Sequence, residues 1–317
     1  MIGRRVAVDL PTTIGSVRLP NPVLTASGTS GHGAELAPYL DLGALGAVVV
    51  KSLSAEPWAG NPPLRLHETR SGMLNSVGLQ GPGVTAWLND DLPALLATGA
   101  RVVASIWGRS VAEYEAAAAL LADAPAGVVA VEVNLSCPNT EAARDLFAHS
   151  AAATREAMEV TAPCGRPRWA KLSPNVTDLV PIARAAQEGG AEAVTLVNTV
   201  LAMAIDPETG EYRLGSGDRG GGLSGPAIHP VAVRAVHDVH AAFPALPIVG
   251  VGGISTGDDA AELLLAGASA VQVGTATFAD PRAPARVLRE LQGWARRTGR
   301  HRLDDIVGTA HRRETTP

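Results

Sequence analysis

The sequence is poor in cysteine and in lysine. Among its 317 residues the only cysteines are Cys137 and Cys164, and the only lysines are Lys51 and Lys171. Two cysteines are too few for a disulfide framework or for the ligands of an iron–sulfur cluster, and this usage is consistent with a reducing compartment. Because arginine supplies every other strong cation, the position of each lysine is informative.

Long apolar runs and clusters of basic residues are also missing. No stretch of about 18 uninterrupted apolar residues occurs, and residues 1–21 contain no apolar run of signal-peptide length. The net charge is −5 and the arginines are scattered, so the chain lacks the electrostatic signature of proteins that bind nucleic acid or anionic membranes. We therefore expect a cytoplasmic protein with no membrane and no nucleic-acid partner.

Eight short apolar runs recur along the chain, with helix-like segments between them. Most lack the alternation of half-exposed strands, as expected for strands buried on both faces. The expected strands are residues 23–26, 47–50, 102–106, 128–133, 169–172, 193–197, 248–251 and 270–273. This order predicts an α/β protein with a (β/α)8 TIM barrel, and a barrel of this length needs no linker. We expect residues 1–317 to form a single domain.

Two connections are too long for ordinary loops between a strand and a helix, which usually have about two to six residues. Residues 52–99 are rich in proline and glycine in their early part, and residues 199–225 end in a glycine-dense stretch. Each follows an expected strand. Both should therefore rise from the C-terminal face of the barrel, where barrel enzymes carry their active sites.

Polar, cationic and glycine residues stand at the C-terminal ends of the expected strands. Any one of them could be an ordinary loop residue, but their coincidence at one face favours a binding site. In chain order these ends carry Ser27 and Gly28, Lys51 and Ser52, Ser105, Asn134 to Cys137, Lys171, Asn198 and Thr199, Gly252 and Gly253, and Gly274 and Thr275.

The last two strand ends predict a phosphate site. Gly252 with Gly253, and Gly274 with Thr275, allow backbone N–H groups to approach an anion closely, at the place where many barrels bind phosphate. Lys51 should point into the same site. An unpaired buried ammonium is costly, so we expect it to face an anionic or strongly polar ligand unless solvent covers it. The same argument applies to Lys171.

Amides and one thiol complete the predicted site. Asn75, Asn134, Asn139 and Asn198 can donate and accept together, which suits a planar ring with alternating carbonyl and N–H groups, although asparagine is also common in turns. Cys137 directly follows a strand in an exposed loop, unlike a core cysteine. Cys164 precedes the strand at 169–172, toward the opposite face, and is expected to be a bystander.

Eight motifs spread over nearly the whole chain form a specific combination. They are NPVLTASG at 21–28, GNPPLR at 60–65, GMLNSVGLQ at 72–80, NLSCPN at 134–139, NT at 198–199, AID at 204–206, GGLSGPAI at 221–228 and VGGI at 251–254. With this combination the chain closely resembles the class 1 dihydroorotate dehydrogenases, and most of all the catalytic subunit of the NAD-linked subtype, class 1B.

The resemblance implies a flavoenzyme of pyrimidine (UMP) biosynthesis that oxidises (S)-dihydroorotate to orotate. FMN would accept the hydride at the barrel mouth, Cys137 would be the general base, and no metal is expected. The residues implied to hold FMN are Ser27, Lys51, Ser52, Asn134, Lys171, Val197, Gly225, Gly252, Gly253, Gly274 and Thr275, the last four at its phosphate. Those implied to bind orotate are Lys51, Asn75, Gly78, Leu79, Asn134, Asn139, Asn198 and Thr199.

The subtype also implies partners. A homodimer is expected, with a second subunit that carries FAD and an iron–sulfur cluster for NAD reduction. The chain has no cysteine cluster and no G-x-G-x-x-G unit in a strand-turn-helix context, so it should not reduce NAD alone. Two departures from the family pattern stand near the substrate: glycine at 81 in place of a frequent asparagine, and Thr140 to Arg144 in place of a glycine pair.

Three other interpretations remain open. A module of the dihydropyrimidine dehydrogenase kind and a tRNA dihydrouridine synthase are also flavin barrels. The tRNA enzyme should have a basic surface and an added RNA-binding domain, neither of which a net charge of −5 suggests. A non-catalytic barrel that only binds FMN would have no need of the base, the lysines and the asparagines together.

Overall fold

The protein is built around a barrel of eight parallel strands. The structure, a computed structural model, describes residues 8, 10–135 and 147–312. The barrel strands are β3 (Val23–Thr25), β4 (Val48–Val49), β7 (Val102–Ile106), β8 (Val128–Asn134), β9 (Arg168–Lys171), β10 (Ala193–Leu196), β13 (Ile248–Val251) and β14 (Ala270–Val273). Their order is β3-β14-β13-β10-β9-β8-β7-β4, and a parallel bridge between Leu24 and Ala47 joins the two outer strands. All eight expected strands and the TIM barrel are thereby confirmed.

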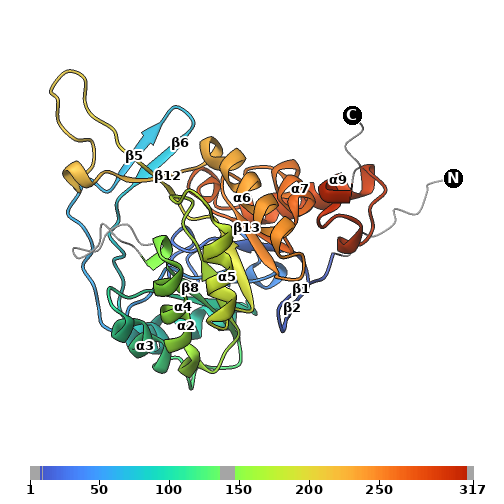
Figure 1. Cartoon of the computed structure of the whole chain (residues 1–317), viewed down its shortest axis with the longest axis horizontal. Coiled ribbons are helices and arrows are strands. Elements are labelled where there is room, and N and C mark those ends of the chain that lie inside the picture. Colours follow the sequence, from blue (N-terminus) through green and yellow to red (C-terminus); the bar gives the residue numbers. More distant parts are fainter. Residues whose placement is uncertain (1–7, 9, 136–146, 313–317) are drawn as a thin grey trace.

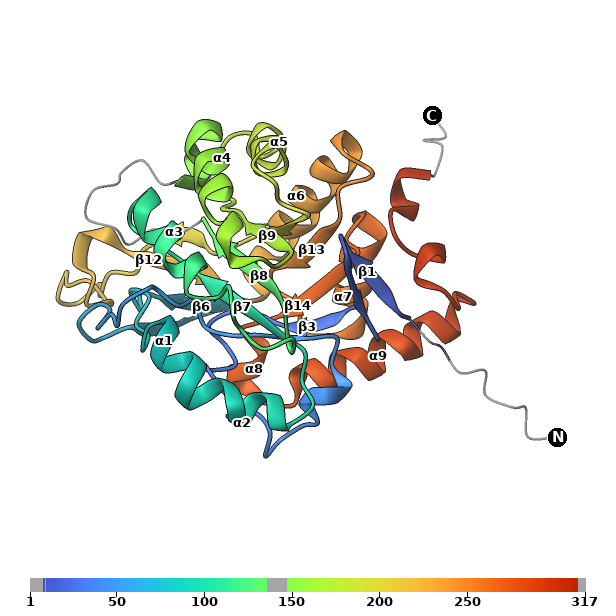
Figure 2. The same ribbon diagram turned by 90° about the horizontal axis from the view of Figure 1, so that it is seen from below.

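Helices surround this barrel (Figures 1 and 2). They are α1 (Val84–Ala86), a π-helical turn (Trp87–Asp91), α2 (Leu92–Ala97), α3 (Val111–Ala119), α4 (Ala151–Val160), α5 (Val180–Glu188), α6 (His229–Ala242), α7 (Gly257–Ala266), α8 (Ala276–Ala279) and α9 (Ala283–Arg297). The largest hydrophobic cluster fills the layer between the strands and the helices. No helix among the described residues is both long and apolar enough to cross a membrane.

A short hairpin closes one end of the barrel. Strands β1 (Thr12–Ile14) and β2 (Val17–Leu19) pair antiparallel around a turn at Gly15, whose φ of 59° suits glycine. Ile14, Val17 and Leu19 pack on inward-facing apolar side chains of the barrel. We call this group the closed-end cluster: Ile14, Val17, Leu19, Leu24, Ala47, Val49, Val103, Ala130, Trp169, Ala193, Val249 and Ala270.

The two long connections meet in a second sheet at the opposite end. Strands β5 (Leu66–Thr69) and β6 (Gly72–Asn75) come from the first connection, and β11 (Val200–Ala202) and β12 (Gly221–Ser224) come from the second. They form an antiparallel sheet in the order β11-β12-β6-β5. Figures 1 and 2 place the β5, β6 and β12 region far from the β1–β2 hairpin. We call the end beside this sheet, where the parallel strands end, the mouth.

Candidate active site

Alternation along each strand sorts the side chains inside the barrel by height. Successive residues of a strand point to opposite faces, so every second one points inward. On β8, Ala130 belongs to the closed-end cluster, Glu132 follows above it, and Asn134 reaches the mouth. On β9, Trp169 belongs to the same cluster and Lys171 reaches the mouth. Along one strand, an apolar residue therefore lies at the closed end, and polar residues further along the same inward face lie nearer the mouth.

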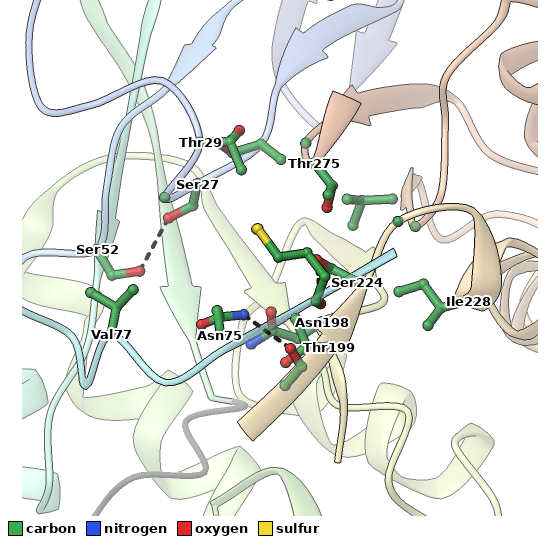
Figure 3. Close-up of a pocket in the computed structure, with 18 of the residues that line it drawn as sticks. Ser27, Thr29, Ser52, Asn75, Val77, Asn198, Thr199, Ser224, Ile228 and Thr275 are labelled. Carbon is green, nitrogen blue, oxygen red and sulfur yellow. Dashed lines mark hydrogen bonds between the residues drawn. The ribbon is translucent and has the colours of Figure 1, made fainter. Parts of the chain in front are cut away.

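The mouth holds a pocket of about 1120 Å³ that is partly open to solvent. Its lining comes both from the C-terminal ends of the barrel strands and from the small antiparallel sheet. Every predicted cofactor or substrate residue that the structure describes lines this pocket. Figure 3 shows Ser27, Ser52, Asn75, Asn198, Thr199 and Thr275 around it. Cys137 and Asn139 lie outside the described residues.

Backbone suited to an anion lies on one side of the pocket, after β13 and β14. Gly252 and Gly253 have φ values of 143° and 69°, which few other residues adopt. Nδ1–H of His229 donates to the Gly252 carbonyl oxygen over 2.8 Å. Because this holds the carbonyl against α6, His229 fixes the peptide at the start of the loop. Thr256 and Asp259 then form a capping box that begins α7.

Hydroxyl groups line the wall formed by the ends of β3, β4 and β7. Ser52 Oγ lies 3.2 Å from Ser27 Oγ and 2.9 Å from Ser105 Oγ, and it accepts from Asn134 Nδ2 over 3.2 Å. The Tyr114 hydroxyl on α3 donates to the Asn134 carbonyl oxygen over 2.7 Å. The Ser27–Ser52 contact is the dashed line between those residues in Figure 3. This network of hydrogen bonds holds the Asn134 side chain in place.

The two lysines enter the pocket from different strands. Lys51 follows β4 and runs past Gly28, where an added Cβ would lie 3.7 Å from Nζ. Lys171 ends β9, is 4% exposed, and has Nζ 3.5 Å from Oε1 of Glu132. Burial lowers the pKa of His32, a neighbour of Lys51, so this imidazole is neutral near pH 7. The positive charge at the pocket therefore comes from lysine.

Amides and the small sheet form the opposite wall. Asn75 Nδ2 on β6 donates to the Gly222 carbonyl oxygen on β12 over 3.2 Å. Asn175 Nδ2 donates to the Thr199 carbonyl oxygen over 3.0 Å, and its Oδ1 accepts from the Leu201 backbone N–H over 2.8 Å. The side chain of Thr199 fits only because residue 222 is glycine, since a Cβ there would lie 2.0 Å from Thr199 Oγ1.

Leu79 lies in a sterically strained backbone conformation beside the pocket. Its φ is 62°, the only positive value for a residue other than glycine in the described chain. Trp58 Nε1–H donates to the carbonyl oxygen of Gly78 over 2.9 Å, and Leu79 packs on Trp107. A hydrogen bond at Gly78 and the packing of Leu79 on Trp107 thus hold this segment in place. A strained backbone conformation persists only where the surrounding structure holds it.

Several residues of the site were not assigned to it from the sequence. Ser105 was noted at a strand end without a role, and Asn175 and His229 act through backbone carbonyls that only the folded chain brings near them. Glu132 stands in the apolar run VVAVEV, where the single acid was the available signal. An ionisable residue inside a run that should be buried marks a place that needs a partner.

Comparison with known proteins gives a consistent family. The family model described as "Dihydroorotate dehydrogenase" matches residues 9–294. A "Dihydroorotate dehydrogenase B (NAD(+)), catalytic subunit" of Desulforudis audaxviator is 49% identical over 309 residues, covering 96% of this chain and 98% of that protein. One of Alkaliphilus metalliredigens is 45% identical over 303 residues, covering 95% and 99%. A candidate dihydroorotate dehydrogenase A (fumarate) of Solibacter usitatus is 48% identical over 302 residues, covering 95% and 98%.

Proposed function

The chain belongs to the dihydroorotate dehydrogenase family, oxidoreductases of pyrimidine biosynthesis that act on the CH–CH bond of dihydroorotate, and we propose that it oxidises (S)-dihydroorotate to orotate with bound FMN. One observation carries this proposal. A single pocket at the barrel mouth combines glycine backbone suited to a phosphate with two lysines and several amides suited to an oxidised ring.

Members of this family are flavoproteins, and the pocket residues fit FMN. Gly252, Gly253, Gly274 and Thr275 would hold the phosphate through backbone N–H groups. Lys171 is buried with its ammonium in the pocket wall, which suits the polar edge of a flavin ring. A ring there would also contact Ser27, Ser52, Asn134 and Val197, and Gly225 would lie near the phosphate.

The remaining polar residues would orient dihydroorotate. Lys51 suits the substrate carboxylate, and the amides of Asn75, Asn134 and Asn198 suit its carbonyl and N–H groups. Gly78, Leu79 and Thr199 line the same part of the pocket, and Asn139 is proposed to join them. FMN bound there would supply the acceptor for the hydride from C6.

Cys137 is proposed to remove the proton from C5 of dihydroorotate. It stands two residues after Leu135 in the sequence, and β8 ends with Asn134 in the pocket lining. A free cysteine titrates at about 8.5, and the thiolate is the basic form, so flavin reduction should quicken as the pH rises toward that value.

The electron acceptor and the assembly are proposed from the relatives. We propose a homodimer that delivers electrons to NAD through a subunit with FAD and an iron–sulfur cluster, in line with the NAD(+) catalytic subunits. Gly215 to Gly220 match the spacing G-x-G-x-x-G, but they join antiparallel strands β11 and β12 rather than a strand and a helix. NAD reduction at full rate by the isolated chain would contradict the proposal of a partner subunit. Efficient reduction of fumarate would favour the fumarate-linked subtype instead.

The test of the proposed base is Cys137→Ala. This variant should retain FMN and orotate binding but reduce its flavin with dihydroorotate at least about a hundredfold more slowly, the lower scale for loss of a general base. Stopped-flow recording of flavin absorbance without oxygen measures the rate. Cys164→Ala is the control, since Cys164 is buried in the main hydrophobic cluster, does not line the pocket and should have no part in the reaction. An unchanged rate in Cys137→Ala would remove Cys137 from the mechanism.

A further inference from the structure

A carboxylate lies inside the barrel between the closed-end cluster and the pocket. Glu132 on β8 is 0% exposed. Thr195 on β10 and Gln272 on β14 stand at the same height, each between a residue of the closed-end cluster and a residue of the pocket. With Lys171 they form what we call the polar layer: Glu132, Lys171, Thr195 and Gln272.

The two oxygens of Glu132 have different surroundings. Oε2 accepts from Thr195 Oγ1 over 3.0 Å and from Gln272 Nε2 over 2.7 Å, so two other strands hold it in place. Oε1 accepts no hydrogen bond from the described residues and lies 3.5 Å from Lys171 Nζ. The carboxylate is therefore fixed by one oxygen and presents the other to the lysine as an ion pair.

Packing alone does not account for this arrangement. A buried ion pair is costly to desolvate, and apolar residues of similar volume often replace such a pair without loss of stability. The layer directly below consists of buried apolar residues such as Ala130, Trp169 and Ala193. Unlike the residues of that layer, Lys171 lies in the wall of the pocket. Glu132 therefore affects a positive charge that lies next to any bound ligand.

We propose that Glu132 is a positioning residue that holds Lys171 and partly neutralises its charge, and that it thereby lowers the reduction potential of the flavin. This inference rests on the proposed function, because it requires a flavin in the pocket. A cation beside the flavin ring favours the reduced, electron-rich form. A carboxylate 3.5 Å from that cation offsets part of the effect.

The variant Glu132→Gln tests this directly. The glutamine carbonyl oxygen can still accept from Thr195 and Gln272, so its amide nitrogen would face the Lys171 ammonium and leave that charge uncompensated. At a fixed ambient potential we expect the ratio of reduced to oxidised flavin to rise about tenfold, which for a two-electron couple is an increase of about 30 mV. Equilibration with a reference dye without oxygen measures it.

Three further variants separate the charge from the packing. Thr195→Val removes one hydrogen bond to Glu132 but keeps the carboxylate, so the ratio should stay near that of the wild type. Glu132→Met also removes the charge, puts an apolar side chain of similar volume in its place, and should raise the ratio even if Glu132→Gln folds poorly. In a Lys171→Met background, Glu132→Gln should no longer change the ratio, as a double-mutant cycle requires.

The outcomes distinguish this inference from the proposed function. A wild-type protein that binds no flavin would overturn both. A wild-type protein that binds flavin, with unchanged potentials in Glu132→Gln and Glu132→Met, would overturn the inference and leave the function standing. An equal shift with and without Lys171 would also overturn it, because Glu132 would then act on the flavin by another route.

Discussion

The closed end and the mouth of the barrel are built by the same strands but differ in chemistry and in backbone geometry. At the closed end Trp169, Ala130 and Ala193 belong to the apolar cluster that packs on the β1–β2 hairpin. The next inward residues of those strands, Lys171, Glu132 and Thr195, are polar, and at the mouth Gly253 and Leu79 have positive φ values. Mutations at the closed end should therefore change stability with little effect on binding. Mutations at the mouth should change binding first.

The largest expected effect is at the closed end, in Trp169→Ala. Trp169 is 0% exposed, and its loss should lower the free energy of unfolding by about 3–5 kcal/mol while the folded fraction still binds flavin with unchanged affinity. Urea unfolding and flavin titration measure the two quantities. Trp169→Phe is the control, because Trp169 Nε1 has no hydrogen-bond partner in the described chain, and it should lose much less stability. A weaker flavin affinity with unchanged stability would contradict the division between the ends.

A glycine at the mouth should show the next largest effect. Gly253 and Gly299 share a φ of 69°, but a Cβ at 253 would lie 2.7 Å from His229 Cβ and 2.9 Å from the Gly225 carbonyl oxygen, whereas nothing lies within 4 Å at 299. Gly299→Ala therefore measures backbone strain alone, about 1 kcal/mol, and Gly253→Ala should cost about 3 kcal/mol.

Binding should separate these two alanine variants further. Gly253→Ala should weaken flavin binding, because the loop after β13 would have to move, and Gly299→Ala should leave it unchanged. Equilibrium dialysis of flavin against each protein gives the affinity. Equal flavin affinities in the two variants would show that the loop after β13 does not hold the cofactor.

The sequence predicts the barrel well and its ends less well. Buried strands such as 102–106 and 248–251 are dense apolar runs, so their position was clear and their bounds are confirmed. The hairpin at 12–19 was missed because each of its strands has three residues. The small sheet was missed because its strands are short, and because β6 and β12 contain glycine and pair across a long separation in the chain.

The residues of the candidate site were also predicted only in part. Residues that act through their own side chains at strand ends, such as Lys51 and Asn134, were found because the position of a strand end can be read from the sequence. Asn175 and His229 were not, because each holds backbone from another segment. Such roles depend on which loops become neighbours, and a single sequence does not contain that information.

The smallest expected effect depends on pH and concerns Asp259, in the first turn of the helix that follows Gly252 and Gly253. Burial alone would raise the pKa of Asp259, but the N–H groups of Ser255 and Thr256 outweigh it, so this pKa lies below its usual value. Its stabilising contribution is therefore present above the unfolded value of about 3.9 and is lost as the pH falls through the folded pKa. Asp259→Asn should cost about 1 kcal/mol at pH 7.

Unfolding in urea at a series of pH values checks this prediction. The difference in unfolding free energy between the wild type and Asp259→Asn should shrink as the pH falls below about 4, because the Asp259 carboxyl then binds a proton more readily in the unfolded chain than in the folded one. A constant difference from pH 7 to pH 3 would mean that the charge of Asp259 contributes nothing. Flavin affinity at pH 7 should change little, since Asp259 caps α7 and does not line the pocket.

Anaerobic titration of the purified protein with dihydroorotate tests the central claim most directly. The claim is that the pocket at the mouth holds FMN together with dihydroorotate and joins them in one reaction. We predict yellow protein with about one FMN per chain, which loses its visible absorbance as dihydroorotate is added and forms orotate in equal amount. A protein whose bound flavin is bleached by dithionite but not by dihydroorotate would contradict the claim.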